Sequence, residues 1–180
     1  MTVPTMIATA KAIALQAKAI ALQMFVVAIA TIALSASSDA RLAPPIALPD
    51  RDGTTVTLES LRGRVVLVDI WASWCPPCKA AFPAYDQLYR DYRDRGFEVL
   101  AINVDEKRAA ADAFLNGREF TMRVLFDPKG TAPMGFDLKA MPTSYLVDKR
   151  GAIRFSHEGF TDKVVQQYRS EIEQLIAEKP

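Results

Sequence analysis

Two cysteines three positions apart are the residues of this sequence best suited to chemistry. Cys75 and Cys78 stand in the segment WASWCPPCK, between the apolar run Val65–Trp71 and a stretch with helical periodicity. A C-x-x-C motif between a strand and a helix indicates thiol–disulfide redox chemistry. Cys75 would lie at the helix start, where unpaired N–H groups and the helix dipole stabilise a thiolate. We therefore expect Cys75 to have the lower pKa and Cys78, one turn further on, to be more buried.

Pro76 and Pro77 fit the first helical positions, where a missing N–H costs little. Two other uses of the cysteines remain open. A structural disulfide would close a very small loop and restrain little of the unfolded chain. A zinc site needs two further ligands, and His157 is the one histidine of the sequence. We favour a redox-active disulfide, with no metal ion and no other cofactor.

The composition narrows the class of protein. The chain has 180 residues, of which half are hydrophobic. It carries 22 Lys and Arg against 21 Asp and Glu. Such a composition is globular, and two cysteines cannot make a disulfide-rich scaffold. The near-neutral charge argues against a nucleic-acid partner, which would need a basic surface.

The first 35 residues resemble an export segment. Lys11 and Lys18 precede the uncharged run Met24–Leu34, and small residues follow it. This order is typical of a secretory signal. An uncleaved anchor is the alternative, although the apolar stretch is a little short of the roughly 20 residues of a spanning helix. In both cases the lysines keep the amino end in the cytoplasm, so the rest should be extracytoplasmic, in the periplasm if the cell has one.

The domain organisation follows from this division: residues 1–35 are a signal peptide or membrane anchor, 36–44 a linker, and 45–180 one domain. That domain alternates between strand-like and helix-like stretches. Periodicity and turn signals predict an amino-terminal hairpin, parallel strands joined by helices, a late antiparallel hairpin and a final helix. The predicted strands are 46–48, 55–58, 65–71, 97–104, 124–126, 144–148 and 152–156, and the predicted helices are 76–95, 107–115 and a last one from Thr161.

The segment VLVDIWASWCPPCKAAFP resembles the active-site segment of the thioredoxin superfamily, and more narrowly that of the TlpA/ResA-like thiol–disulfide oxidoreductases. The resemblance covers about residues 45–180 and includes Trp74, Pro83 and the triplet Met141-Pro142-Thr143. It implies an α/β thioredoxin-like fold, with a mixed central sheet flanked by helices and an added N-terminal β-hairpin. It also implies an exported, often membrane-anchored protein.

The resemblance assigns roles to several residues. Asp69 matches the buried acid below the cysteines, and its place in an apolar strand should raise its pKa and suit proton exchange with Cys78. A purely structural Asp69 is the alternative. Pro142 matches the cis-proline that faces the cysteines and helps bind an extended partner segment. Glu106 matches an acid near the active site, although a first-turn Glu that favours the helix dipole explains it as well.

The resemblance also marks a partner-binding surface. Trp74 should shield the disulfide and contact partners, and Pro76, Pro77, Met141 and Thr143 join it as substrate-binding candidates. Trp71 should belong to the core. His157, on a presumed strand, should be a surface residue or a hydrogen-bonded one.

We therefore expect an extracytoplasmic enzyme that exchanges a Cys75–Cys78 disulfide with protein thiols and disulfides. The resemblance favours the reducing direction, for example in cytochrome c or copper-site maturation, with electrons from a membrane thiol donor. A redoxin-type thiol peroxidase is one rival, but nothing besides CPPC is available for its reactive cysteine. A thiol-based copper metallochaperone is another, and the sequence lacks a Met/His cluster that would help select copper.

Overall fold

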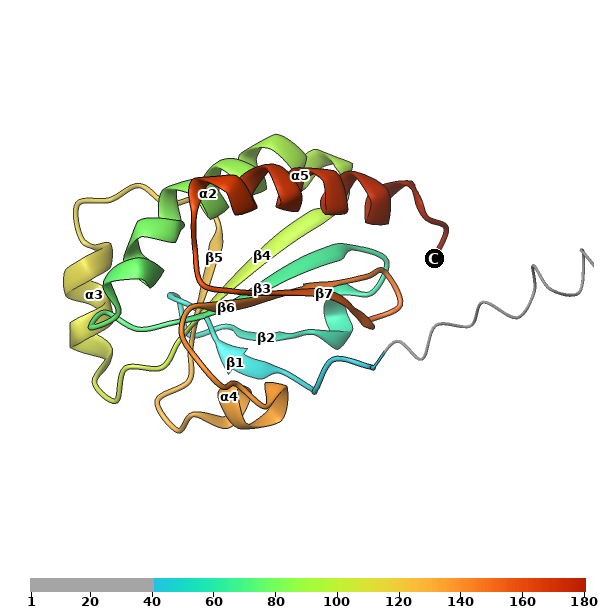
Figure 1. Ribbon diagram of the computed structural model, residues 1–180. Helices are drawn as coiled ribbons and strands as arrows, with labels where there is room; N and C mark the ends of the chain where they lie inside the picture. Colours follow the sequence, from blue (N-terminus) through green and yellow to red (C-terminus); the bar gives the residue numbers. More distant parts are fainter. Residues whose placement is uncertain (1–40) are drawn as a thin grey trace, which may run out of the picture. The chain divides into compact units, whose positions relative to one another are not determined.

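The computed structural model describes residues 41–180 (Figure 1). The expected export segment and the first part of the linker lie outside the described residues.

A five-stranded mixed sheet forms the centre of the domain, with strand order β5-β4-β3-β6-β7. The first three of these strands along the chain run parallel, whereas β6 is antiparallel to β3 and β7 is antiparallel to β6. This confirms the mixed sheet expected from the sequence. The strands are β3 (Val65–Trp71), β4 (Phe97–Asn103), β5 (Arg123–Phe126), β6 (Thr143–Val147) and β7 (Ile153–Glu158).

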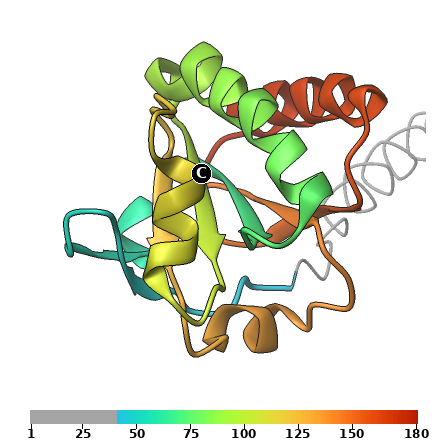
Figure 2. The same cartoon turned by 90° about the vertical axis from the view of Figure 1, so that its left-hand side faces the viewer.

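Helices cover both faces of the sheet. The long helices α2 (Pro76–Tyr92) and α5 (Asp162–Ala177) lie side by side on one face (Figures 1 and 2). Helix α3 (Arg108–Leu115) packs into the same apolar cluster through Ala111 and Leu115. The hairpin of β1 (Ala47–Pro49) and β2 (Thr55–Thr57) covers the other face together with α4 (Thr131–Phe136).

Burial on both faces explains the apolar character of the central strand. Side chains alternate along a strand, so Val65, Leu67 and Trp71 face α2 and α5, whereas Val66 and Val68 face the hairpin and α4. A strand covered on both sides is apolar throughout. Asp69 is the exception, because the same alternation points its carboxyl toward α2 and α5.

The helix ends agree closely with the sequence signals. Helix α2 ends at Tyr92, and a 3-10 turn (Arg93–Arg95) carries the chain to Gly96, which adopts a left-handed conformation with φ 86°. Glycine tolerates this conformation at a helix end. Thr161 occupies the N-cap position of α5, as predicted, but its side chain makes no capping hydrogen bond.

Helix α4 is an element that the sequence patterns do not predict. Its six residues include Pro133 and Gly135, which are poor helix formers, and it begins after the left-handed Gly130. Packing of Ala132 and Phe136 against the second apolar cluster supplies the stability that its sequence lacks.

Candidate active site

Cys75 and Cys78 form a disulfide at the amino end of α2. Cys75 is the N-cap residue, and Pro76 and Pro77 occupy the first two helical positions. The N–H of Cys78 donates to Cys75 Sγ at 3.3 Å. Cys78 is fully buried, whereas Cys75 keeps 5% of its surface exposed. The arrangement gives the Cys75 sulfur one helix-end N–H, that of Cys78, and slightly easier access than the Cys78 sulfur has.

The loop that leads to Cys75 is held by a second acid, Asp105. Its carboxylate accepts hydrogen bonds from the backbone N–H and the hydroxyl of Ser73, both at 3.0 Å, and from the Asn103 amide at 2.8 Å. Asp105 is 5% exposed and follows the end of β4, next to the end of β3. The sequence does not reveal this residue, because nothing in the order of residues shows that the ends of β3 and β4 bring Asp105 against Ser73.

Asp69 lies inside the domain on β3, on the face of the sheet that α2 and the cysteines cover. The side chain is fully buried, and neither carboxyl oxygen has a hydrogen-bond partner within residues 41–180. Burial away from water raises the pKa of Asp69 from 3.8 to about 8. The expected upward shift is thus present, and its cause is desolvation. A carboxyl with this pKa exchanges protons near neutral pH.

The segment Met141–Thr143 stands at the same end of the sheet as the cysteines. The Met141–Pro142 peptide bond is cis, as the resemblance implied. Met141 packs against the apolar cluster that contains both cysteines, and Thr143 pairs with Ile70, one residue before the end of β3. The Pro142 carbonyl accepts from Gly159 at 2.8 Å, which ties the segment to the end of β7.

The other candidates separate into exposed and buried residues. Trp74, directly before Cys75, is 66% exposed. Glu106 is exposed beside the buried Asp105, and its catalytic role stays a prediction. Trp71 is fully buried, as expected. His157 is 9% exposed and lies 2.7 Å from Glu171, so it is a hydrogen-bonded residue rather than a surface one.

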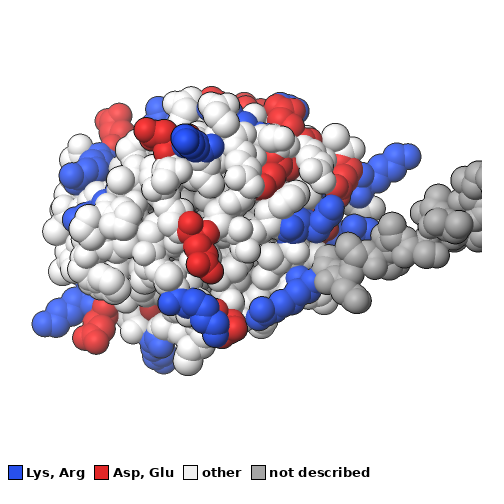
Figure 3. Space-filling model, viewed as in Figure 1, with Lys and Arg blue, Asp and Glu red and all other residues white. Residues whose placement is uncertain are grey.

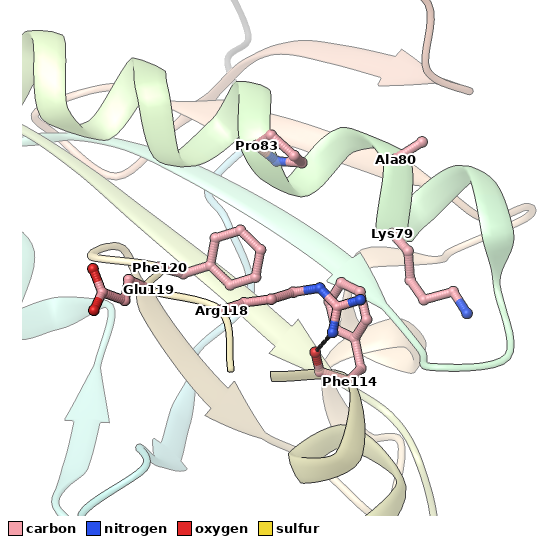
Figure 4. Close-up of a pocket in the computed structure, with 7 residues that line it drawn as sticks. All are labelled: Lys79, Ala80, Pro83, Phe114, Arg118, Glu119 and Phe120. Carbon is pink, nitrogen blue, oxygen red and sulfur yellow. Dashed lines mark hydrogen bonds between the residues drawn. The ribbon is translucent and has the colours of Figure 1, made fainter. Parts of the chain in front are cut away.

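A groove of about 600 Å³ runs beside the first turns of α2 (Figure 4). Phe114 and Phe120 line it together with Pro83. The Arg118 guanidinium lies 4.6 Å from the centre of the Phe114 ring, and Lys79 Nζ lies 5.9 Å from it. Lys79 therefore extends along this groove, which begins at the residue after Cys78.

Charged groups of both signs are scattered over the face shown in Figure 3, and much of its left side, where α2 begins in Figure 1, is uncharged. Within residues 41–180, no group of three or more His, Cys, Asp or Glu side chains is placed to hold a metal ion. No helix in the same part of the chain has the length and apolar character needed to cross a membrane.

Residues 40–156 match the model of the AhpC/TSA family. The chain belongs to this family. This AhpC/TSA member is similar to the thiol-disulfide oxidoreductase ResA of a Bacillus cereus strain, with 33% identity over 112 residues, which cover 62% of this chain and 64% of the relative. The first such relatives are matched over 53% to 66% of their own length.

Solved structures agree with the family. A Chlorobium tepidum protein assigned as thiol:disulfide interchange protein DsbE is 37% identical, with a TM-score of 0.74 over 78% of this chain and 99% of that chain. A second Chlorobium tepidum structure, a thiol:disulfide interchange protein of the thioredoxin family, has a TM-score of 0.69 at 22% identity, over 79% of this chain and 100% of that one. The AhpC/TSA chain thus has the expected thioredoxin-like fold with its N-terminal hairpin.

Proposed function

We propose that this AhpC/TSA protein is an extracytoplasmic thiol–disulfide oxidoreductase that exchanges its Cys75–Cys78 disulfide with cysteines of protein partners. One observation carries the proposal: the disulfide caps α2, and the face of the sheet that α2 covers also holds Asp69, a fully buried carboxyl whose oxygens have no partner within residues 41–180. A purely structural disulfide would not require a buried acid, such as Asp69, that ionises near neutral pH. The names of the similar proteins, a thiol-disulfide oxidoreductase and thiol:disulfide interchange proteins, support the same class of reaction.

The reaction begins with the reduced protein. The Cys75 thiolate attacks a partner disulfide, forms a mixed disulfide and releases one partner sulfur as a thiolate. The Cys78 thiol then gives its proton to the Asp69 carboxylate, and its sulfur attacks Cys75 Sγ. The second partner sulfur leaves, so the partner gains two electrons and the Cys75–Cys78 disulfide is formed. A donor dithiol returns the two electrons.

The reducing direction, the substrates and the location rest on the sequence. The resemblance to TlpA/ResA-like proteins favours reduction of cysteines in cytochrome c or copper-site maturation. The extracytoplasmic space is kept oxidising, so a membrane thiol donor must supply the electrons. Lys11, Lys18 and the apolar run that follows them support export, with release after cleavage or attachment to the inner membrane.

A protein partner suits the surface around Cys75. Trp74 offers an exposed aromatic side chain, and the groove of Figure 4 adds the half-buried rings of Phe114 and Phe120 beside the first turns of α2. Exposed aromatic surface of this kind is typical of protein-binding sites. We therefore place the partner segment between Pro142 and Trp74, with its flank toward the groove.

Reduction of insulin by dithiothreitol tests the activity. We expect the full chain to accelerate insulin precipitation, and Cys75→Ser to abolish the acceleration. Ser156→Ala, an exposed hydroxyl on β7, is the matched control and should behave as the wild type. Fast peroxide consumption by the wild type without insulin reduction would contradict the proposal and favour the peroxidase.

A further inference from the structure

Three buried hydroxyl groups form a connected chain on the Asp69 side of the sheet. The Tyr168 hydroxyl of α5 lies 2.5 Å from Ser144 Oγ on β6 and 3.3 Å from the Tyr85 hydroxyl of α2. All three side chains have an exposed fraction of 0%. Neither the sequence pattern nor the proposed disulfide exchange gives these hydroxyls a role.

The chain of hydroxyls reaches Asp69 through the sheet register. Ser144 is the residue directly opposite Asp69 where β3 pairs with β6. Residues opposite each other on one face of an antiparallel pair have Cβ atoms about 5 Å apart. Tyr85 approaches from α2, and the charge of Asp69 contributes to the raised pKa of Tyr85. Ser144, at one end of the hydroxyl chain, is therefore the cross-strand neighbour of the carboxyl.

Counting hydrogens shows that one donor is left over. Three hydroxyls carry three hydrogens, and the two bonds among them use two. The third O–H stands at Ser144, at Tyr85 or at Tyr168, depending on the direction in which the chain donates. Asp69 is the buried neighbour whose oxygens lack a partner within residues 41–180. None of the three hydroxyls bonds the carboxyl in this oxidised structure. A buried acceptor without a donor is costly, and the spare O–H of the cross-strand neighbour Ser144 is the donor that a side-chain rotation would turn toward it.

We propose that Tyr85, Tyr168 and Ser144 form a reversible hydrogen-bond donor for Asp69. They donate to its carboxylate before it takes the Cys78 proton, and the chain reverses to accept from the protonated carboxyl afterwards. This inference rests on the role of Asp69 in the proposed function. It makes the three hydroxyl residues positioning residues for the base of the resolving step.

The tyrosines stay protonated while Asp69 titrates. Burial raises the pKa of both Tyr85 and Tyr168, so each keeps its O–H at neutral pH. They can therefore donate or accept, whichever the protonation state of Asp69 requires.

The other groups around Asp69 do not serve as its hydrogen-bond donor. Strand β4 contributes Ala101 opposite Asp69, and α2 contributes the two cysteines. Strand β7 contributes His157 and α5 contributes Glu171, which are engaged with each other at 2.7 Å. Glu171 also accepts from Gln167 at 3.0 Å. The His157 ring packs edge-on against the Tyr168 ring, 4.7 Å away, and so holds Tyr168 from the outer side.

The proton balance gives the sign of the effect. In the resolving step Asp69 must be ionised to take the Cys78 proton, so the rate rises with pH through the pKa of Asp69. A hydroxyl that donates to the carboxylate favours the charged form and lowers this pKa. Removal of the donor should raise the pKa and reduce the rate at neutral pH.

The test follows the reduced full chain with 5,5′-dithiobis(2-nitrobenzoic acid) as the probe. Cys75 releases the first thionitrobenzoate, and the attack of Cys78 on the adduct releases the second, so the second phase measures resolution. We expect Ser144→Ala to move its pH midpoint upward by about one unit, which lowers the rate at neutral pH about tenfold. Tyr168→Phe should move the midpoint in the same direction by less, because it removes the group that orients the Ser144 hydroxyl but leaves that hydroxyl in place. Tyr145→Phe is the matched control, because its hydroxyl bonds Phe136 on the opposite face of the sheet.

A second background shows whether the effect acts through Asp69. In Asp69→Asn, Tyr168→Phe should cause no further shift of the midpoint. Wild-type midpoints in both hydroxyl variants, together with a changed profile in Asp69→Asn, would overturn the hydroxyl donor and leave the proposed base intact. An unchanged pH profile of the resolving step in Asp69→Asn would show that Asp69 is not the base. Thermal unfolding of each variant identifies a loss of folding, and Ser144→Ala, the smaller change, supplies the result if Tyr168→Phe unfolds.

Discussion

Ser73 gives both its backbone N–H and its hydroxyl to the carboxylate of Asp105, each at 3.0 Å. Ser73 stands two residues before Cys75, and Asp105 stands two residues after the end of β4. Two bonds to one carboxylate fix both the position and the orientation of the loop. The N-cap position of Cys75 therefore depends on a residue from a neighbouring strand end.

Asp105→Ala should destabilise the oxidised protein by about 2–3 kcal/mol, because hydrogen bonds to a buried charged group are lost. Urea unfolding of the oxidised chain measures this change in the free energy of unfolding. Glu106→Ala is the matched control, since its side chain is exposed, and it should change stability by less than about 0.5 kcal/mol. Equal effects of the two substitutions would show that Asp105 does not hold the loop.

Asp69 should make the stability of the protein depend on pH. Its pKa is about 8 in the folded protein and 3.8 in an unfolded chain, so between these values the folded state alone keeps the proton. Its stabilising contribution is complete below about pH 4 and is lost as the pH rises to about 8. The free energy of unfolding of Asp69→Asn relative to wild type should therefore increase with pH across this window.

The slope of that increase should approach about 1.4 kcal/mol per pH unit. Denaturant unfolding at a series of pH values gives the difference directly. Ser156→Ala, which replaces an exposed side chain that carries no titratable group, should give a flat difference over the same range. A flat line for Asp69→Asn as well would mean that Asp69 is ionised in the folded protein at neutral pH.

The two cysteines should differ in reactivity once the disulfide is reduced. Cys75 caps the helix and keeps some exposure, whereas Cys78 is fully buried. A thiolate at a helix start forms at lower pH than a buried thiol. Iodoacetamide at mildly acidic pH should therefore label Cys75 first, as peptide mass spectrometry can show. Earlier labelling of Cys78 would be incompatible with the helix-end argument.

Elements with strong local patterns could be predicted from the sequence, and contacts between elements could not. The apolar run Val65–Trp71 predicts the exact bounds of β3, because a strand buried on both faces is apolar at nearly every position. Asp69 and the cysteines could be predicted for a similar reason: an acid in an apolar strand and a C-x-x-C at a helix start are local signals.

The missed features depend on tertiary structure. Helix α4 contains Pro133 and Gly135 and is stabilised by packing rather than by propensity. Tyr85 and Tyr168 have the spacing of core residues, and their connected hydroxyls appear only when α2 and α5 lie side by side on the sheet. His157 has its partner, Glu171, on α5, and this pairing likewise cannot be predicted from the order of residues.

The location can be tested with a reporter. Lys11 and Lys18 before the apolar run predict that residues 45–180 are extracytoplasmic. A phosphatase that is active only after export, fused behind Pro180, should be active in cells. A fusion that starts after residue 40 lacks the segment and should be inactive at equal expression. An inactive full-length fusion would contradict export.

Trapping of the mixed disulfide tests the central claim, that Cys75 attacks the partner and Cys78 resolves the adduct. Cys78→Ser, expressed with its own amino-terminal segment, should accumulate covalent protein adducts that disappear on reduction, because the resolving sulfur is missing. Cys75→Ser should accumulate few, because Cys78 is buried. Non-reducing gels with mass spectrometry of each adduct make the comparison. Equal adducts from both variants, or adducts from Cys75→Ser alone, would contradict the assigned order of attack.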